Sequence, residues 1–118
     1  MGVPVQFSMS IRSKRTATVV QLGGELDLAS HHKLEDALAP ALESGAELVV
    51  LDLGELEFMD VAGLRALLRS KERAASAGKQ LVLVAPGPPI SRLLSLTGQE
   101  QAFQVYGSVA AALEPGPA

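Results

Sequence analysis

The sequence predicts a mixed α/β domain with a small, mostly parallel β-sheet. From Ala17 onward, short apolar segments alternate with amphipathic helical segments, and this order is typical of right-handed βαβ units. In residues 5–11, apolar and polar residues alternate strictly, which predicts an additional strand with one covered face. Because only a short polar stretch separates this strand from the next, we expect the two to form an antiparallel hairpin.

The composition excludes several classes of protein. The chain has 118 residues and no cysteine, so it can bury one core without disulfides or thiolate metal sites. We expect one domain over residues 1–118, with its core at about 5–113 and a frayed tail at 115–118. A net charge of -3 and 3% aromatic residues argue against nucleic-acid binding. No apolar run reaches the roughly 18 residues of a spanning helix, so we expect a cytoplasmic protein without direct membrane insertion.

The first half of the chain is predicted to contain a second strand and a helix. The second strand covers residues 17–22, and the Gly-Gly pair at 23–24 is expected to end it. Ser30 is the candidate N-cap of the helix, and Gly45 is its stop signal. Pro40 removes one hydrogen bond inside this helix and crowds a carbonyl, so we expect a kink or an early end just before it.

The centre of the predicted fold is a buried strand followed by a helix. The apolar run at 48–53 is typical of a strand covered on both faces, and Gly54 is expected to end it. Phe58 in the connection is predicted to point inward, Asp60 to be the N-cap of the helix, and Val61 to lie on the buried helix face. The opposite face carries Ala62, Arg65, Ala66, Arg69, Glu72, Arg73 and Ser76. We interpret this face, beginning at Ala62, as the working surface.

The last third supplies two short strands and two helices. A strand is predicted at 81–85, followed by a helix that Pro89 opens and that turns Leu96 inward. A brief strand at 103–106 and a terminal helix at 109–114 complete the sequence pattern.

Candidate site residues follow the ends of the predicted strands. Asp27 follows the second strand and Asp60 the third. Because functional groups gather at the carboxyl ends of parallel strands, we expect the two carboxylates on one rim. We interpret them as solvated groups rather than a divalent cation site, and His31 and His32 as surface residues. No metal or cofactor is predicted.

A basic ridge is predicted along the second helix. Arg65, Arg69 and Arg73 recur at i, i+4 and i+8, so they lie on one side of the helix. A solvated face is the usual meaning of such spacing. Contact with a partner is the alternative, because the ridge continues directly from Ala62.

Three blocks of the sequence resemble the STAS family of anti-sigma factor antagonists and their relatives. Residues 24–30 resemble the family segment G-E-L-D-x-x-[ST], and residues 52–64 resemble D-L-x-x-[VL]-x-F-[MIL]-D-S-[STA]-G-L. Residues 92–106 resemble the closing third of such domains. The resemblance implies a small mixed sheet with helices mainly on one face.

The resemblance also implies a role in transcription regulation by partner switching. In antagonists of this family, a serine or threonine at the start of the helix is phosphorylated by a partner that is both anti-sigma factor and kinase. The unphosphorylated form binds that partner and so frees the sigma factor. Here the matching position is Ala62, and no hydroxyl side chain occurs from Leu53 to Arg69. The residues expected to contact the partner are Asp27, Asp60, Val61, Ala62, Gly63, Arg65, Ala66 and Arg69.

A different partner and a different chemistry are the alternatives to this function. The resemblance also allows a small STAS subunit of a lipid-transport ABC system, which binds the ATPase. An aspartyl-phosphate receiver centred on Asp52 would need an acidic pair after the first strand and a lysine after the last, and the sequence has neither. Without cysteine or a Gly-rich phosphate loop, no enzyme activity is predicted. The sequence does not set the oligomeric state, so a homodimer remains open.

Overall fold

Within residues 6–114, which the computed structural model describes, five strands form one sheet in the order β1-β2-β3-β4-β5. The strands are β1 Ser8–Lys14, β2 Ala17–Leu26, β3 Leu48–Met59, β4 Gln80–Val84 and β5 Val105–Tyr106. β1 runs antiparallel to β2, and the other neighbouring pairs are parallel. The predicted mixed, mostly parallel sheet is confirmed. Val5, the expected start of the first strand, lies outside the described residues.

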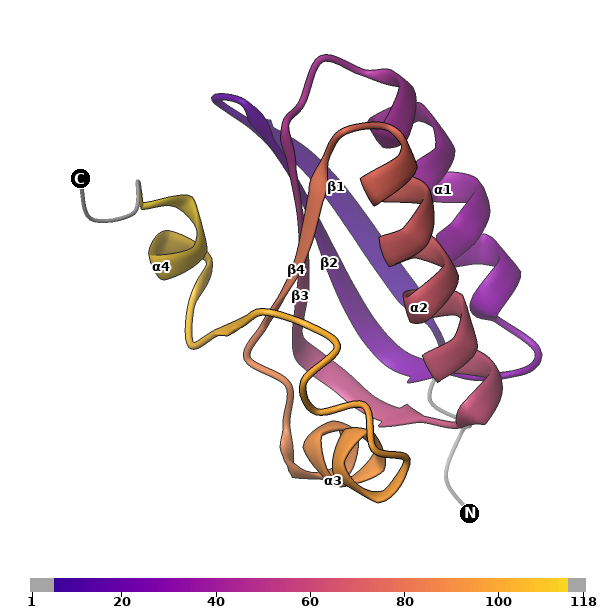
Figure 1. The fold of residues 1–118 in the computed structure, drawn as a ribbon. Helices are drawn as coiled ribbons and strands as arrows, with labels where there is room; N and C mark the ends of the chain where they lie inside the picture. Colours follow the sequence, from indigo (N-terminus) through magenta and orange to yellow (C-terminus); the bar gives the residue numbers. More distant parts are fainter. Residues whose placement is uncertain (1–5, 115–118) are drawn as a thin grey trace.

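Four helices accompany the sheet in the same part of the chain. They are α1 His31–Glu43, α2 Val61–Ser76, α3 Pro88–Leu96 and α4 Val109–Leu113. α1 and α2 lie side by side along one face, whereas α4 lies against the other face (Figure 1). α3 packs near the end of β3. None of these helices is long and apolar enough to cross a bilayer.

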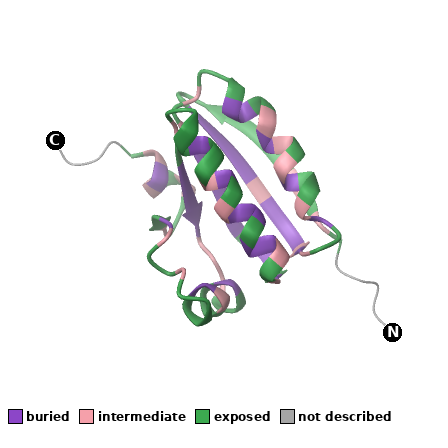
Figure 2. Ribbon diagram, turned by 45° about the vertical axis from the view of Figure 1, so that its right-hand side comes forward, coloured by how far each residue is buried: buried purple, intermediate pink, exposed green. Residues whose placement is uncertain are grey.

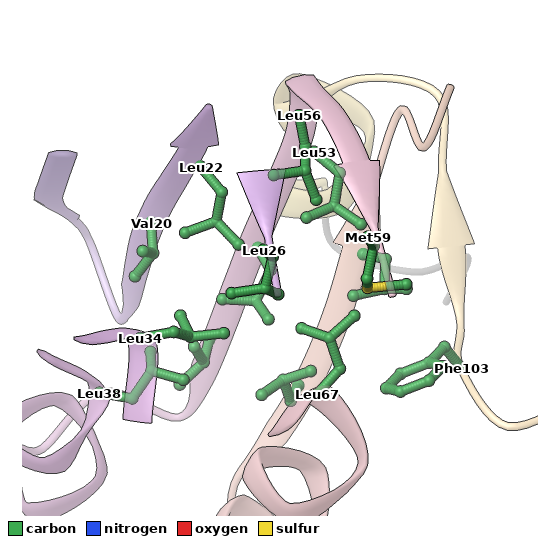
Figure 3. Packing of buried hydrophobic residues seen from close by; sticks show 14 of the residues in the cluster. Val20, Leu22, Leu26, Leu34, Leu38, Leu53, Leu56, Met59, Leu67 and Phe103 are labelled. Carbon is green, nitrogen blue, oxygen red and sulfur yellow. The ribbon is translucent and has the colours of Figure 1, made fainter. Parts of the chain in front are cut away.

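The main core lies between the sheet and the pair α1 and α2. Leu22 and Leu53 from the sheet and Leu67 from α2 are fully buried there, and Phe103 closes one end (Figure 3). Buried positions line the sides of α1 and α2 that face the sheet, and exposed positions lie on their outer sides (Figure 2). A smaller core on the opposite face consists of Val19, Val50, Val82, Val84 and Ala112. The two cores explain why the first half of β3, residues 48–53, contains only one polar residue, Asp52.

β2 and β3 are both longer than predicted. The Gly-Gly pair at 23–24 does not end β2, and Gly54 does not end β3. The β2–β3 register shifts on both sides of this pair, so the glycines lie in an irregular part of a continuing strand. Gly24 has a φ of 79°, and a Cβ there would lie 1.9 Å from the carbonyl oxygen of Gln6. These glycines therefore allow a close backbone approach rather than a turn.

Pro40 does not end α1 early. The helix continues through it to Glu43. The proline itself is exposed, while Leu38, Ala41 and Leu42 on either side of it are buried against the sheet. Burial of this apolar stripe offsets the hydrogen bond that the proline removes.

Candidate partner-binding rim

The carboxyl ends of β2 and β3 meet beside the start of α2, as the sequence predicted. The Asp60 amide donates to the carbonyl of Leu26 at 3.2 Å. The Leu28 amide in turn donates to Asp60 Oδ2 at 3.3 Å, so the two loops are held together. We call the surface formed here the β2–β3 rim; its members are Asp27, Leu28, Asp60, Val61 and Ala62.

Asp60 is the N-cap of α2, as predicted. Its Oδ1 accepts a hydrogen bond from the amide of Gly63 at 2.9 Å, which satisfies one of the free amides of the first helical turn. Its Oδ2 binds the neighbouring loop at Leu28. One carboxylate therefore caps the helix and joins the two loops of the rim.

The carboxylate of Asp27 is directed into its own loop. Its Oδ1 accepts from the amides of Ala29 and Ser30, at 3.0 and 3.1 Å. Ser30 begins the turn into α1, but its hydroxyl does not cap the helix; it lies 2.8 Å from the carbonyl of Glu25 and 3.0 Å from Asp27 Oδ1. Among residues 6–114, no three His, Asp or Glu side chains come together as a metal site. We therefore interpret Asp27 as a loop-ordering group.

An exposed apolar side chain follows each of these two aspartates in the chain. Leu28 is 74% exposed and Val61 is 48% exposed, although Val61 was predicted to point inward. Ala62 follows in the first turn of α2 and is half-buried. Exposed apolar side chains that gather on one surface mark sites of interaction. Leu28 could not be predicted from the sequence, because no periodic pattern assigns a face to a residue in a loop.

Two of the residues expected to contact a partner are not accessible on α2. Ala66 is fully buried, because α2 is covered by α1 as well as by the sheet (Figure 1). Gly63 is buried too, so neither residue offers a side chain to a partner. Arg65 is exposed and continues the rim along the helix.

One arginine of the basic ridge, Arg69, is already engaged in an ion pair within the protein. Arg69 Nε donates to Glu35 Oε1 at 2.7 Å, and its Nη2 donates to Oε2 at 3.2 Å. His31 Nδ1 lies 2.9 Å from the same Oε2. Arg69 therefore links α2 to α1, whereas Arg65 and Arg73 form no ion pair within the described part of the chain.

Acid should weaken this link between α1 and α2. The hydrogen bond from Arg69 lowers the pKa of Glu35 below its ordinary value of 4.5, against the opposing effect of burial. A lowered folded-state pKa gives stability that is present above the ordinary pKa and is lost as the pH falls through the lowered value. The effect should be small, since exposed ion pairs contribute little.

Urea unfolding of wild type and Glu35→Gln between pH 7 and pH 3 measures this contribution. The difference in unfolding free energy should shrink toward pH 3. Asp36→Asn is the matched control, because Asp36 is exposed and forms no ion pair within residues 6–114. A Glu35→Gln difference that stayed constant down to pH 3 would contradict this role of the pair.

Comparison with known families identifies the domain. Residues 9–107 match the family model described as "Mlab, STAS domain". The match covers the β2–β3 rim and most of the sheet, and the chain belongs to the STAS domain family. The resemblance drawn from residues 24–30 and 52–64 is thereby confirmed.

The relatives agree on a regulatory role. The anti-sigma-F factor antagonist RsfB of Mycobacterium tuberculosis is 26% identical over 113 residues, covering 96% of this chain and 92% of RsfB. An anti-sigma-B factor antagonist of Staphylococcus aureus is 28% identical over 86 residues, covering 73% and 80% of the two chains. A crystal structure of an anti-sigma factor antagonist from Mycobacterium paratuberculosis superposes with a TM-score of 0.84, at 26% identity over 96% of each chain.

Proposed function

We propose that this chain is an anti-sigma factor antagonist that binds a kinase-type anti-sigma factor through the β2–β3 rim. The rim offers Leu28 and Val61 as exposed apolar contacts around the small Ala62. Asp60 holds these residues in fixed positions through its bonds to both loops. A rigid apolar surface loses little conformational entropy when a partner packs on it.

The main support for the proposal is the position of Ala62. It lies in the first turn of α2, and the resemblance to the family motif matches it to the phosphoacceptor position. The loop between β2 and α1 contains one hydroxyl, that of Ser30, which is buried and hydrogen-bonded within its own loop. The rim therefore lacks an acceptor for phosphate, and we infer that the protein stays in the form that binds its partner.

Mass spectrometry tests the lack of a phosphoacceptor. Wild-type protein incubated with the anti-sigma factor kinases of its own genome and ATP should gain no phosphate on the peptide that covers residues 53–69. Ala62→Ser restores a hydroxyl at the family position and serves as the positive control. Phosphate found on the rim of the wild-type protein would contradict a permanently active antagonist.

Calorimetric titration of the same purified kinases with wild-type protein tests the function itself. At least one should bind, and binding should release its sigma factor in a gel-filtration assay. The absence of binding to every such kinase would overturn the proposal.

In a second candidate function, the β2–β3 rim is again the binding surface, but the partner is a different protein. A small STAS subunit of a lipid-transport ABC system would bind the ATPase, and a rim without a phosphoacceptor suits such a permanent subunit as well. The relatives named as antagonists favour the first candidate. Co-purification with an ABC ATPase, together with no binding to any anti-sigma factor, would favour this second function over the first.

A further inference from the structure

A second apolar surface adjoins the β2–β3 rim. A groove of about 350 Å³ lies between the end of β3 and α3. It is lined by Phe58, Met59, Pro88, Pro89, Arg92, Leu93 and Leu96. Phe58 and Met59 immediately precede Asp60, so the groove continues from the rim along the chain.

The side chains at the mouth of this groove are not part of the core. Phe58 is 45% exposed and Leu96 is 78% exposed, although the sequence predicted both to point inward. α3 is held to the sheet by Ile90 and Leu94, which are buried. Leu96 lies two residues beyond Leu94 and so falls on a different side of the helix. Neither Phe58 nor Leu96 belongs to the buried core clusters, and removal of their exposed apolar surface from water would be favourable.

The groove also carries one unpaired charge. Arg92 is the only charged residue in its lining, and it forms no ion pair within the part of the chain that the structure describes. A guanidinium beside an apolar groove suits a carboxylate, which it can bind with two parallel hydrogen bonds. The chemistry therefore matches an apolar side chain that lies next to an acidic one.

We propose that this groove binds a short segment of the partner protein in which a large apolar residue adjoins an aspartate or glutamate. The apolar side chain enters between Phe58 and Leu96, and the carboxylate pairs with Arg92. The inference rests on the proposed function, because it extends the contact made at the rim. It adds a second anchoring point whose charge sets the choice of partner.

Binding of the anti-sigma factor kinase that recognises the wild-type protein tests the proposal. Leu96→Ser and Arg92→Glu should each weaken binding about tenfold, in the range of an interface anchor. Both side chains are exposed, so thermal unfolding should not change. The matched controls are Ile11→Ser and Arg12→Glu, because these residues are exposed on β1 and should leave binding at the wild-type level.

A cross-link identifies the segment directly. Benzoylphenylalanine placed at position 96 should cross-link to a kinase peptide with an apolar residue beside an acidic one, and the same probe at position 11 should not. Changing that acidic residue to lysine should restore binding to Arg92→Glu.

The outcomes separate the two proposals. If no kinase binds wild type, the proposed function fails and this inference falls with it. If Ala62→Glu loses binding while Leu96→Ser and Arg92→Glu bind normally, the groove proposal alone is overturned.

Discussion

Ala62→Glu should weaken binding of the anti-sigma factor at least about tenfold, equivalent to ~1.4 kcal/mol, with nearly unchanged thermal stability. Ala62 is half-buried in the first turn of α2, where a carboxylate suits the helix dipole. The fold should therefore tolerate the new side chain. The partner should not, because glutamate adds bulk and charge beside Asp60 on a surface of small and apolar residues. Phosphate would bring a larger charge, so glutamate imitates it only in part.

Two variants at the same position separate charge from size. Ala62→Gln has nearly the shape of glutamate without its charge, and it should bind more tightly than Ala62→Glu. Ala62→Ser adds one hydroxyl, and it should bind like wild type. Titration calorimetry and thermal unfolding of all four proteins supply the comparison. An Ala62→Glu protein that bound as tightly as wild type would place the working surface elsewhere and contradict the assignment of the rim.

The arrangement of the rim could be predicted from the sequence because it depends on topology. Parallel strands joined by helices end at one edge of the sheet, so the order of the elements was enough to bring Asp27 and Asp60 together. The cap was predictable for a local reason, since Asp60 stands directly before an apolar periodic segment. The structure confirms both, and adds that Asp60 Oδ2 holds the neighbouring loop through the amide of Leu28.

The ends of β2 and β3 could not be predicted, because glycine has two roles in strands. It can end a strand at a turn, or it can permit an irregular pairing with a close backbone approach. Gly24 has the second role, since the chain at Gln6 leaves no space for a Cβ. The sequence contains no local signal that distinguishes these roles, because the approaching segment is distant along the chain.

The faces of α2 were predicted incompletely for a related reason. A helical wheel assumes one buried side, which fits a helix that packs on a sheet alone. α2 also packs against α1, which covers the side that carries Ala66. The cross-helix bond from Arg69 to Glu35 joins residues that are distant in the sequence. Spacing along one helix predicted the basic ridge, but not that α1 supplies an acidic partner for it.

Gly63→Ala should destabilise the fold by about 1–3 kcal/mol, as expected for overpacking at a tight contact. Helix propensity alone predicts the opposite sign, because alanine is favoured over glycine inside a helix by up to about 1 kcal/mol. The contact decides the outcome: a Cβ at this position would lie 2.3 Å from the carbonyl oxygen of Leu26 and 2.8 Å from Cγ of Met59. α2 would have to move away from the end of β2.

This movement should affect the rim as well as the stability. The same Leu26 carbonyl accepts the amide of Asp60, so lifting α2 strains the bond that fixes the two loops. We therefore expect Gly63→Ala to unfold at a temperature lower by on the order of 5–15 °C, and to bind the partner more weakly at temperatures where it is still folded. Gly45→Ala is the matched control, because nothing lies within 4 Å of a Cβ there. Calorimetric unfolding of both variants and of wild type measures the difference in stability. A Gly63→Ala protein as stable as wild type would show that the start of α2 does not depend on this contact.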